Sequence, residues 1–217
     1  MKNIPFLCVA IMLLTSCNNT KTKSSKRAST NAEKFITLEI DNGPFRGTHK
    51  FVRKKGKLVG GIGIHYFDAT EKSETVQNTF SLEANNLISE SGLSLHSFAV
   101  RAKGEVKRGK HEVVDFKDSN NVENCTSINL SGEKNTLGTF SAFLQNGTCQ
   151  PLKIESLGSW TDKTHHHTRI VEGTYTLSGQ WIIQNANGDT LEKTESSILV
   201  TFSGEHEVLK DEYSTNH

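Results

Sequence analysis

The sequence predicts an all-β protein, most simply an antiparallel β-sandwich, with a closed β-barrel as the alternative. Short runs alternate apolar and polar residues; Ile36, Leu38 and Ile40, for example, alternate with Thr37 and Glu39. Clusters of Gly, Asn, Ser and Lys separate these runs at nearly regular spacing, a pattern typical of sandwiches and barrels. A hydrophobic content of 34% and a mean hydropathy of -0.47 suit strands that bury one face and expose the other.

Most of the chain after residue 34 is expected to form strands. The expected strands span residues 35–40, 49–53, 58–67, 79–84, 93–101, 111–117, 138–144, 150–155, 169–177, 180–184, 190–191 and 196–202. Helix is expected only as single turns, at residues 71–77 and 87–91. The predicted protein is therefore a single all-β domain over residues 35–217.

One strand should contain a bulge. Leu93 and Leu95 share one face of a strand, whereas Phe98 and Val100 have the opposite parity. Because side chains alternate strictly between the two faces, this change predicts an extra residue near Ser97.

Glycine and asparagine mark the turns. Asn146-Gly147 and Asn187-Gly188 each follow a strand-like run, and Asn-Gly is the preferred pair of tight hairpin turns. The expected strand at residues 58–67 contains three positions without a side chain, Gly60, Gly61 and Gly63. We interpret them as a point of strong curvature, with close approach by a ligand or another backbone as the alternative.

The first residues have the features of an export signal. A short charged start precedes an apolar run over residues 4–14, which is too short to span a bilayer as a stable helix. The following stretch Leu14-Thr15-Ser16-Cys17 resembles the lipobox of bacterial lipoproteins. This resemblance implies cleavage after residue 16, acyl chains such as palmitate on Cys17, and anchoring in the bacterial cell envelope.

Residues 17–34 are expected to be the lipidated cysteine and a flexible polar tether, because they lack apolar periodicity. The tether contains Lys21, Lys23, Lys26, Arg27 and Lys34 but only one acid, Glu33. In some Gram-negative lipoproteins, acidic residues just after the lipidated cysteine direct export to the cell surface, and residues 18–20 contain none. The resemblance thus favours the outer membrane, with the protein facing the periplasm.

The remaining cysteines predict one disulfide. Cys8 lies in the segment expected to be removed, and Cys17 is assigned to lipid, which leaves Cys125 and Cys149. In an exported domain, a disulfide is the simplest use of such a pair. Two buried thiols or a metal site are the alternatives.

Few residues suggest chemistry. His165 and His167 would share a face of an extended segment and could bind a metal, with Asp162 or His49 as a third ligand. Exposed histidines without a ligand are the commoner case. Trp181 is expected in the core. Trp160 follows Gly158-Ser159 in a loop, so we expect it to be exposed, and it is the candidate ligand-binding aromatic residue. Glu205 and Glu207 are interpreted as solvent-facing.

The sequence contains no Gly-x-Ser-x-Gly, HExxH, Walker or Rossmann motif. Residues 131–134 match the bare Ser-x-x-Lys pattern of penicillin-recognising enzymes, but Gly132 and the turn-rich context argue against the helix on which that serine must lie. We therefore predict no enzymatic activity and no cofactor. A formal net charge of +1 argues against nucleic-acid binding.

Three stretches carry a fold-level resemblance: residues 137–141 and 172–177, each a Gly-Thr-aromatic opening to a strand, and the closing stretch 200–204. They resemble the β-sandwich domains of unassigned role in many bacterial lipoproteins. Residues 185–191 are similar to turns in barrels of the allene-oxide-cyclase type. The expected function is a lipid-anchored binding or interaction module for a protein or small molecule. The alternatives are a calycin-like barrel holding a small apolar ligand and, third, a metal-dependent envelope enzyme.

Overall fold

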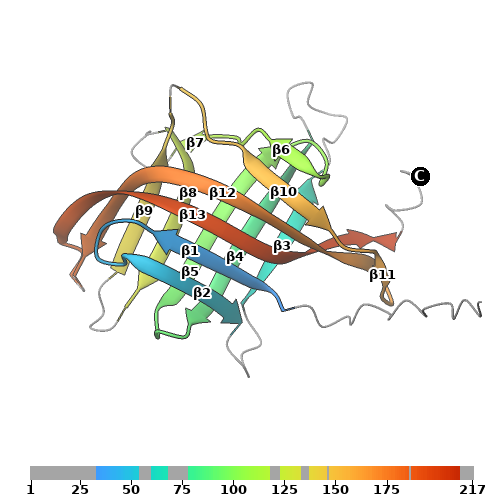
Figure 1. The fold of residues 1–217 in the computed structure, drawn as a ribbon, viewed down its shortest axis with the longest axis horizontal. Helices are drawn as coiled ribbons and strands as arrows, with labels where there is room; N and C mark the ends of the chain where they lie inside the picture. Colours follow the sequence, from blue (N-terminus) through green and yellow to red (C-terminus); the bar gives the residue numbers. More distant parts are fainter. Residues whose placement is uncertain are drawn as a thin grey trace, which may run out of the picture. The chain divides into compact units, whose positions relative to one another are not determined.

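The computed structural model describes residues 33–53, 60–67, 78–117, 123–132, 137–145, 147–185 and 187–210 (Figure 1). Strands dominate these residues, which confirms the all-β class. The strands are β1 (Phe35–Ile40), β2 (Gly47–Arg53), β3 (Gly61–Phe67), β4 (Thr79–Ser89), β5 (Ser94–Lys103), β6 (Gly109–His111), β7 (Phe116–Lys117), β8 (Glu123–Ser131), β9 (Leu137–Phe143), β10 (Leu152–Leu157), β11 (Thr161–Asp162), β12 (His166–Gln184) and β13 (Thr190–Leu209).

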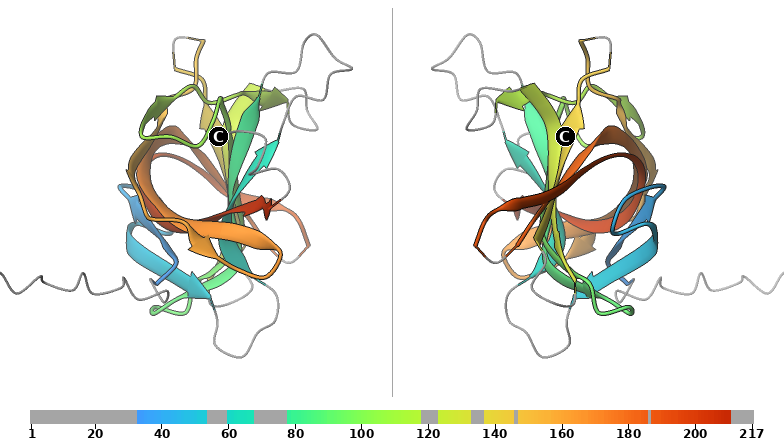
Figure 2. Two further views of the ribbon diagram at one scale, coloured as in Figure 1. Left: turned by 90° about the vertical axis from the view of Figure 1, so that its right-hand side faces the viewer. Right: turned by 90° about the vertical axis from the view of Figure 1, so that its left-hand side faces the viewer.

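The strands form one sheet that closes on itself. From β13 the hydrogen-bonded path runs through β3, β4, β5, β8, β9 and β12, and β12 pairs again with β13. Figure 2 shows the long β12–β13 ribbon curling around the interior. The ring is barrel-like, in keeping with the all-β sandwich or barrel that the sequence predicts. The sheet is mixed and not purely antiparallel, because β3 and β13 pair in parallel.

The strand β12 combines two segments that the sequence analysis predicted as separate strands. Residues 169–177 and 180–184 belong to one strand, β12, so the break expected at Ser178-Gly179 is wrong. Gly179 lies there because a Cβ at this position would be 2.0 Å from the Ser141 carbonyl oxygen on the neighbouring strand. The glycine allows close strand approach instead of ending the strand.

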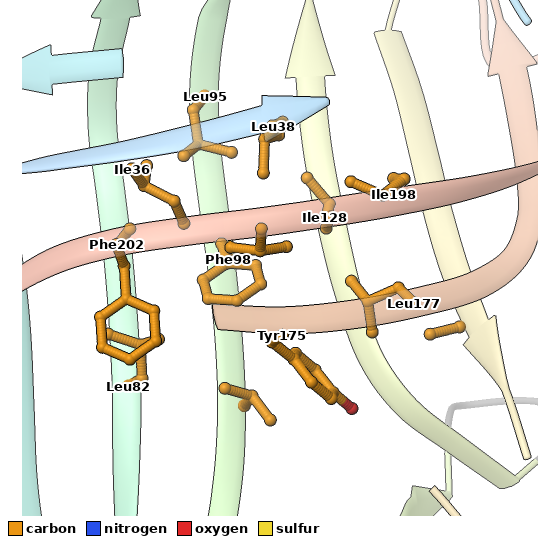
Figure 3. Close-up of a cluster of buried hydrophobic side chains, with 14 of the residues drawn as sticks. Ile36, Leu38, Leu82, Leu95, Phe98, Ile128, Tyr175, Leu177, Ile198 and Phe202 are labelled. Carbon is orange, nitrogen blue, oxygen red and sulfur yellow. The ribbon is translucent and has the colours of Figure 1, made fainter. Parts of the chain in front are cut away.

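Large side chains fill the interior of the ring. The largest fully buried ones include Trp181, Tyr175, Phe98, Phe140 and Phe202, several of which are seen together in Figure 3. The core position expected for Trp181 is confirmed. Burial of each such side chain stabilises the folded state by about 1.5–3 kcal/mol, so this cluster is the main source of stability.

The hydrophobic core is formed entirely within one compact unit of the chain. Its buried apolar residues lie between positions 36 and 202, within the compact unit Asn31–His217. A chain that begins at residue 18 therefore retains every contact of this core. In the described ranges, no helix has the length and hydropathy required to cross a bilayer.

The disulfide is confirmed, and it ties down a strand that the sequence analysis missed. Cys125 in β8 bonds to Cys149, with a Cα–Cα distance of 5.5 Å. In β8 only Ile128 and Leu130 are large apolar residues, and Asn124 and Thr126 occupy further buried positions. The alternation is present but largely polar, which is why hydrophobic periodicity did not reveal the strand.

The two Asn-Gly pairs have different outcomes. Asn187-Gly188 lies in the turn between β12 and β13, and Asn185 Oδ1 accepts hydrogen bonds from the Asn187 and Asp189 amides (2.9 and 3.0 Å), so this hairpin is confirmed. Asn146 lies outside the described residues, but Gln145 and Thr148 on either side of the pair exchange backbone hydrogen bonds (2.8 and 3.1 Å), as a tight two-residue turn requires. This turn does not lead into a longer hairpin, because β9 and β10 pair with β12 and not with each other.

The predicted bulge is confirmed, since the β5–β8 register shifts between Leu95 and Ser97. The helical turn expected at residues 87–91 is wrong, because β4 continues to Ser89. The turn expected at residues 71–77 lies outside the described residues.

Candidate functional site

The ring has a short stretch of pairing between β3 and β13, and a groove lies beside it. On one edge of β13, β1 pairs with residues 198–203, and β3 then pairs at two positions, Gly63 with Glu205 and Ile64 with His206. On one edge of β4, β3 pairs along residues 79–85 and β2 along residues 87–89. A groove of about 630 Å³ lies where β2 and β3 diverge.

Glycines form the floor of this groove. Ile62 and Ile64 are buried in the core, so Gly61, Gly63 and His65 face the outer side of the sheet. A Cβ at Gly61 would have no heavy atom within 4 Å, whereas the imidazole of His65 covers Gly63. The floor at Gly61 is therefore open.

Gly60 has a different role. Its φ is +115°, and a Cβ there would lie 2.7 Å from the Asn86 carbonyl oxygen. Asn86 itself has a φ of 51° and lies where β4 changes partner from β3 to β2. The close approach by another backbone, which was the alternative interpretation of this cluster, is therefore observed at Gly60, whereas Gly61 has open space around its Cβ position.

Acidic and polar side chains form the sides of the groove. Glu83 and Asn85 on β4 stand opposite Gly63 and Gly61 in the register. Glu83 accepts a hydrogen bond from Ser81 Oγ (2.9 Å). On the other side, Glu205 and Glu207 of β13 line the groove.

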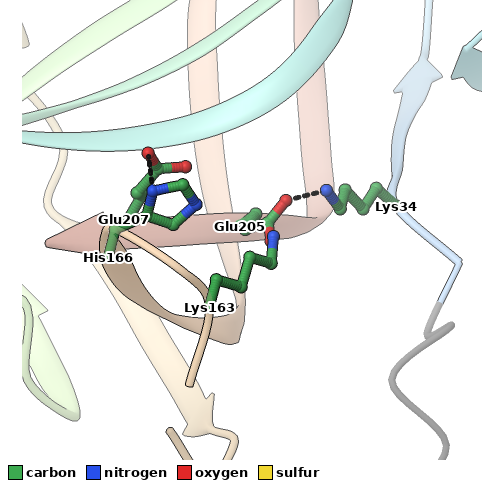
Figure 4. A network of polar contacts seen from close by, with 5 residues as sticks. All are labelled: Lys34, Lys163, His166, Glu205 and Glu207. Carbon is green, nitrogen blue, oxygen red and sulfur yellow. Dashed lines mark hydrogen bonds and ion pairs between the residues drawn. The ribbon is translucent and has the colours of Figure 1, made fainter. Parts of the chain in front are cut away.

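The carboxylates on the β13 side hold three segments together (Figure 4). Glu205 binds Lys34, just before β1, and Lys163 (2.6 Å), while Glu207 lies 3.3 Å from His166 Nδ1. Burial acts to raise the pKa of Glu205, but hydrogen bonds from Lys163 and Lys34 outweigh it and hold that pKa below its ordinary value. The sequence-based interpretation of Glu205 and Glu207 as solvent-facing residues did not anticipate these ion pairs.

The candidate metal ligands do not converge on a site. His167 Nδ1 lies 3.4 Å from Asp162 Oδ1, and Lys210 Nζ occupies the same oxygen at 2.9 Å. The hydrogen bond from Lys210 lowers the pKa of Asp162. His165 is exposed. The described residues hold no group of three His, Cys, Asp or Glu side chains that could bind a metal ion, so metal binding remains a prediction.

Trp160 is half-buried, not the exposed aromatic residue that its loop position suggested. The Arg169 guanidinium lies 4.3 Å from the centroid of its ring, and the His206 ring lies 5.3 Å away. Arg169 donates to His206 Nδ1 (3.2 Å) and to the Val106 carbonyl oxygen (2.8 Å). Trp160 thus packs against Arg169 and the buried His206. Its role in ligand binding remains a prediction.

His206 is a buried residue that the sequence analysis did not single out. Its side chain follows Phe202 and Gly204 on the inner face of β13, and the residue is 4% exposed. Burial, followed by the charges of Arg169 and His65, lowers its pKa to about 4. The imidazole is therefore neutral near pH 7, consistent with its Nδ1 accepting from Arg169. Side chains of a strand alternate between its two faces, so the spacing of four residues from the buried Phe202 predicts that the His206 side chain also points inward.

Comparisons with protein-family models, with curated proteins and with solved structures found no match to the chain. The function must therefore be argued from the chain itself.

Proposed function

We propose that the chain is a lipid-anchored envelope protein whose all-β domain is a non-enzymatic binding module. The groove over Gly61 is the observation that carries the binding role. It combines an open backbone floor with polar walls contributed by distant strands, as small-ligand and peptide sites do. The interior is packed with side chains, so the proposal places the ligand in this outer groove.

The chemistry of the walls favours a ligand that bears positive charge. Four glutamates line the groove, Glu33, Glu83, Glu205 and Glu207, against two permanent cations, Lys34 and Arg53. Three of these acids already have partners in the fold: Glu33 pairs with Lys50, Glu205 with Lys34 and Lys163, and Glu207 with His166. Glu83 and Asn85 then remain as the acceptors beside the open floor, where ammonium or guanidinium groups would find partners.

The anchor rests on the lipobox resemblance of residues 14–17. Multiple acyl chains on Cys17 would hold the protein stably at a membrane, because each buried methylene contributes about 0.8 kcal/mol. The tether over residues 18–34 then leads directly to Lys34 at the groove. We place the protein in the bacterial cell envelope, at the outer membrane facing the periplasm.

A titration tests the binding role. Tetralysine is added to the isotope-labelled chain starting at residue 18, and the amide resonances of Gly60, Gly61 and Gly63 are followed by NMR. We expect saturable shifts at these glycines, no shifts with tetraglutamate, and loss of the shifts in Gly61→Leu, which fills the floor. Equal responses to both peptides, or none, would contradict the proposal.

The anchor is tested separately. Mass spectrometry of the N-terminal peptide from the native host should show an acylated Cys17 at the N-terminus, and Cys17→Ala should move the protein out of the membrane fraction. An unmodified Cys17 would exclude the anchor without affecting the groove.

A further inference from the structure

A second hollow lies away from the groove, beside the turn that joins β5 to β6. Residues 103–111 form this turn, which we call the basic turn. The hollow measures about 580 Å³, and its lining includes three lysines, Lys103, Lys107 and Lys110. Over residues 101–112 the chain has five cationic residues, Arg101, Lys103, Lys107, Arg108 and Lys110, against Glu105 and Glu112.

The backbone of the basic turn is held in place by the rest of the fold. Its anchoring hydrogen bonds run from Gly104 N to Asn78 O (2.7 Å), from Arg108 Nε to Glu155 O (3.0 Å), from Arg169 Nη2 to Val106 O (2.8 Å), and between His111 Nε2 and Lys107 O (2.7 Å). Val106 is also buried, at 5% exposure. The lysines therefore project from an ordered backbone, which lowers the entropy cost of binding.

Charge in the basic turn is only partly compensated. Lys103 pairs with Glu112 at 2.5 Å. Lys107 and Lys110 are exposed, and across the described ranges neither forms an ion pair with a carboxylate. The groove differs, since Lys34, Lys163 and His166 already engage its β13 acids. Among the described residues, Lys107 and Lys110 thus have no carboxylate partner, and their ammonium groups face outward toward an external anion.

We infer that the basic turn binds the phosphate groups of anionic lipid headgroups, as a second membrane contact beside the lipid anchor. This inference rests on the proposed anchor. A flexible tether over residues 18–34 has a mean reach of about 20–25 Å, so it keeps the domain near the surface without orienting it. Lysine suits this role because its ammonium is a compact, mobile charge that does not need bidentate geometry.

The size of the effect follows from the two exposed lysines. A lysine near an anionic bilayer strengthens binding by about fivefold, so removing two should weaken it by about 30-fold. Because a surface potential falls off within a Debye length, added salt should also weaken binding.

Co-sedimentation with vesicles tests the inference. The unlipidated chain starting at residue 18 is mixed with vesicles of phosphatidylglycerol and phosphatidylcholine, or of phosphatidylcholine alone. We expect binding to the anionic vesicles only, and a partition coefficient about 30-fold lower for Lys107→Gln/Lys110→Gln. Arg46→Gln/Lys193→Gln removes the same number of exposed positive charges elsewhere and should stay within about twofold of the unmodified chain.

Three results would overturn the inference. One is absence of binding to anionic vesicles, and another is an equal loss in both double variants, which would assign binding to net charge or the tether. The third is displacement by inorganic phosphate at constant ionic strength, which would identify a soluble anion as the ligand. Because the tested chain carries no lipid, failure of acylation at Cys17 would leave these results unchanged.

Discussion

Gly179 and Gly61 lie in strands of the same ring, and they are glycine for opposite reasons. A Cβ at Gly179 would lie 2.0 Å from the Ser141 carbonyl oxygen, whereas a Cβ at Gly61 would have no heavy atom within 4 Å. The first belongs to what we call the closed wall, strands β8, β9 and β12. The second belongs to the open wall, where β3 meets β13 and β4.

The closed wall has six β9–β12 pairs, a long β8–β9 pairing with one register shift, and the disulfide, while the open wall has two β3–β13 pairs and a groove. Close packing stabilises the fold on one side, and loss of pairing leaves a surface for binding on the other. The difference teaches that a strand glycine marks either a tight contact or an open site. Substitutions can separate these two cases.

The largest expected effect is on the closed wall. Cys125→Ala/Cys149→Ala should lower the free energy of unfolding by about 3 kcal/mol, because the disulfide restricts the unfolded chain. Urea denaturation followed by fluorescence measures this. Reduction of the unmodified protein should have the same effect, and an unchanged midpoint would show that this wall does not depend on the disulfide.

Acid should weaken the open wall at His206. The unfolded chain takes up a proton near pH 6.5, but the folded protein takes it up near pH 4, so between these values the unfolded state binds more protons. The free energy of unfolding should therefore fall by up to about 3 kcal/mol as pH decreases across this window. Urea denaturation at a series of pH values checks this, and His206→Asn should flatten the profile. An equal slope in the variant would assign it to other groups.

Gly179→Ala should cost about 2 kcal/mol, since the added methyl group would force β12 and β9 apart. Thermal and urea unfolding of the variant measure the loss. A neutral result would mean that the closed wall can widen without loss of pairing.

Gly61→Ala should have the smallest effect on stability, within about 0.5 kcal/mol, because its methyl group enters the open groove. It is the matched control for Gly179→Ala, as both place one methyl group on a strand glycine. A large loss at Gly61 would contradict an open floor and remove the basis for the binding proposal.

Local patterns predicted much of this fold. Alternation identified strands such as β1 and β5, parity identified the bulge near Ser97, and the cysteine count identified the disulfide. Local patterns failed where partners decided the structure. The polar alternation of β8 hid a core strand, and the tight turn between Gln145 and Thr148 did not reveal that β9 and β10 pair with β12 and not with each other.

The candidate site was less predictable than the fold. Gly61, Glu83 and Glu205 are far apart in the chain, and nothing in their local sequence indicates that they face one groove. The same holds for Trp160, whose loop position suggested exposure but whose ring packs against Arg169 and His206. Such contacts join residues tens of positions apart, and periodicity reports only on near neighbours.

The sequence by itself determined the all-β class and the disulfide partners, and it predicts an exported, lipid-anchored protein. Each depends on local pattern, composition or a cysteine count. The tertiary structure alone decided that the sheet closes through β12 and β13, and that β3 leaves a groove beside β13. It also decided that the basic turn is fixed by Asn78, Glu155 and Arg169. Strand pairing sets these features, and its free energy depends on contacts between segments that no local pattern encodes.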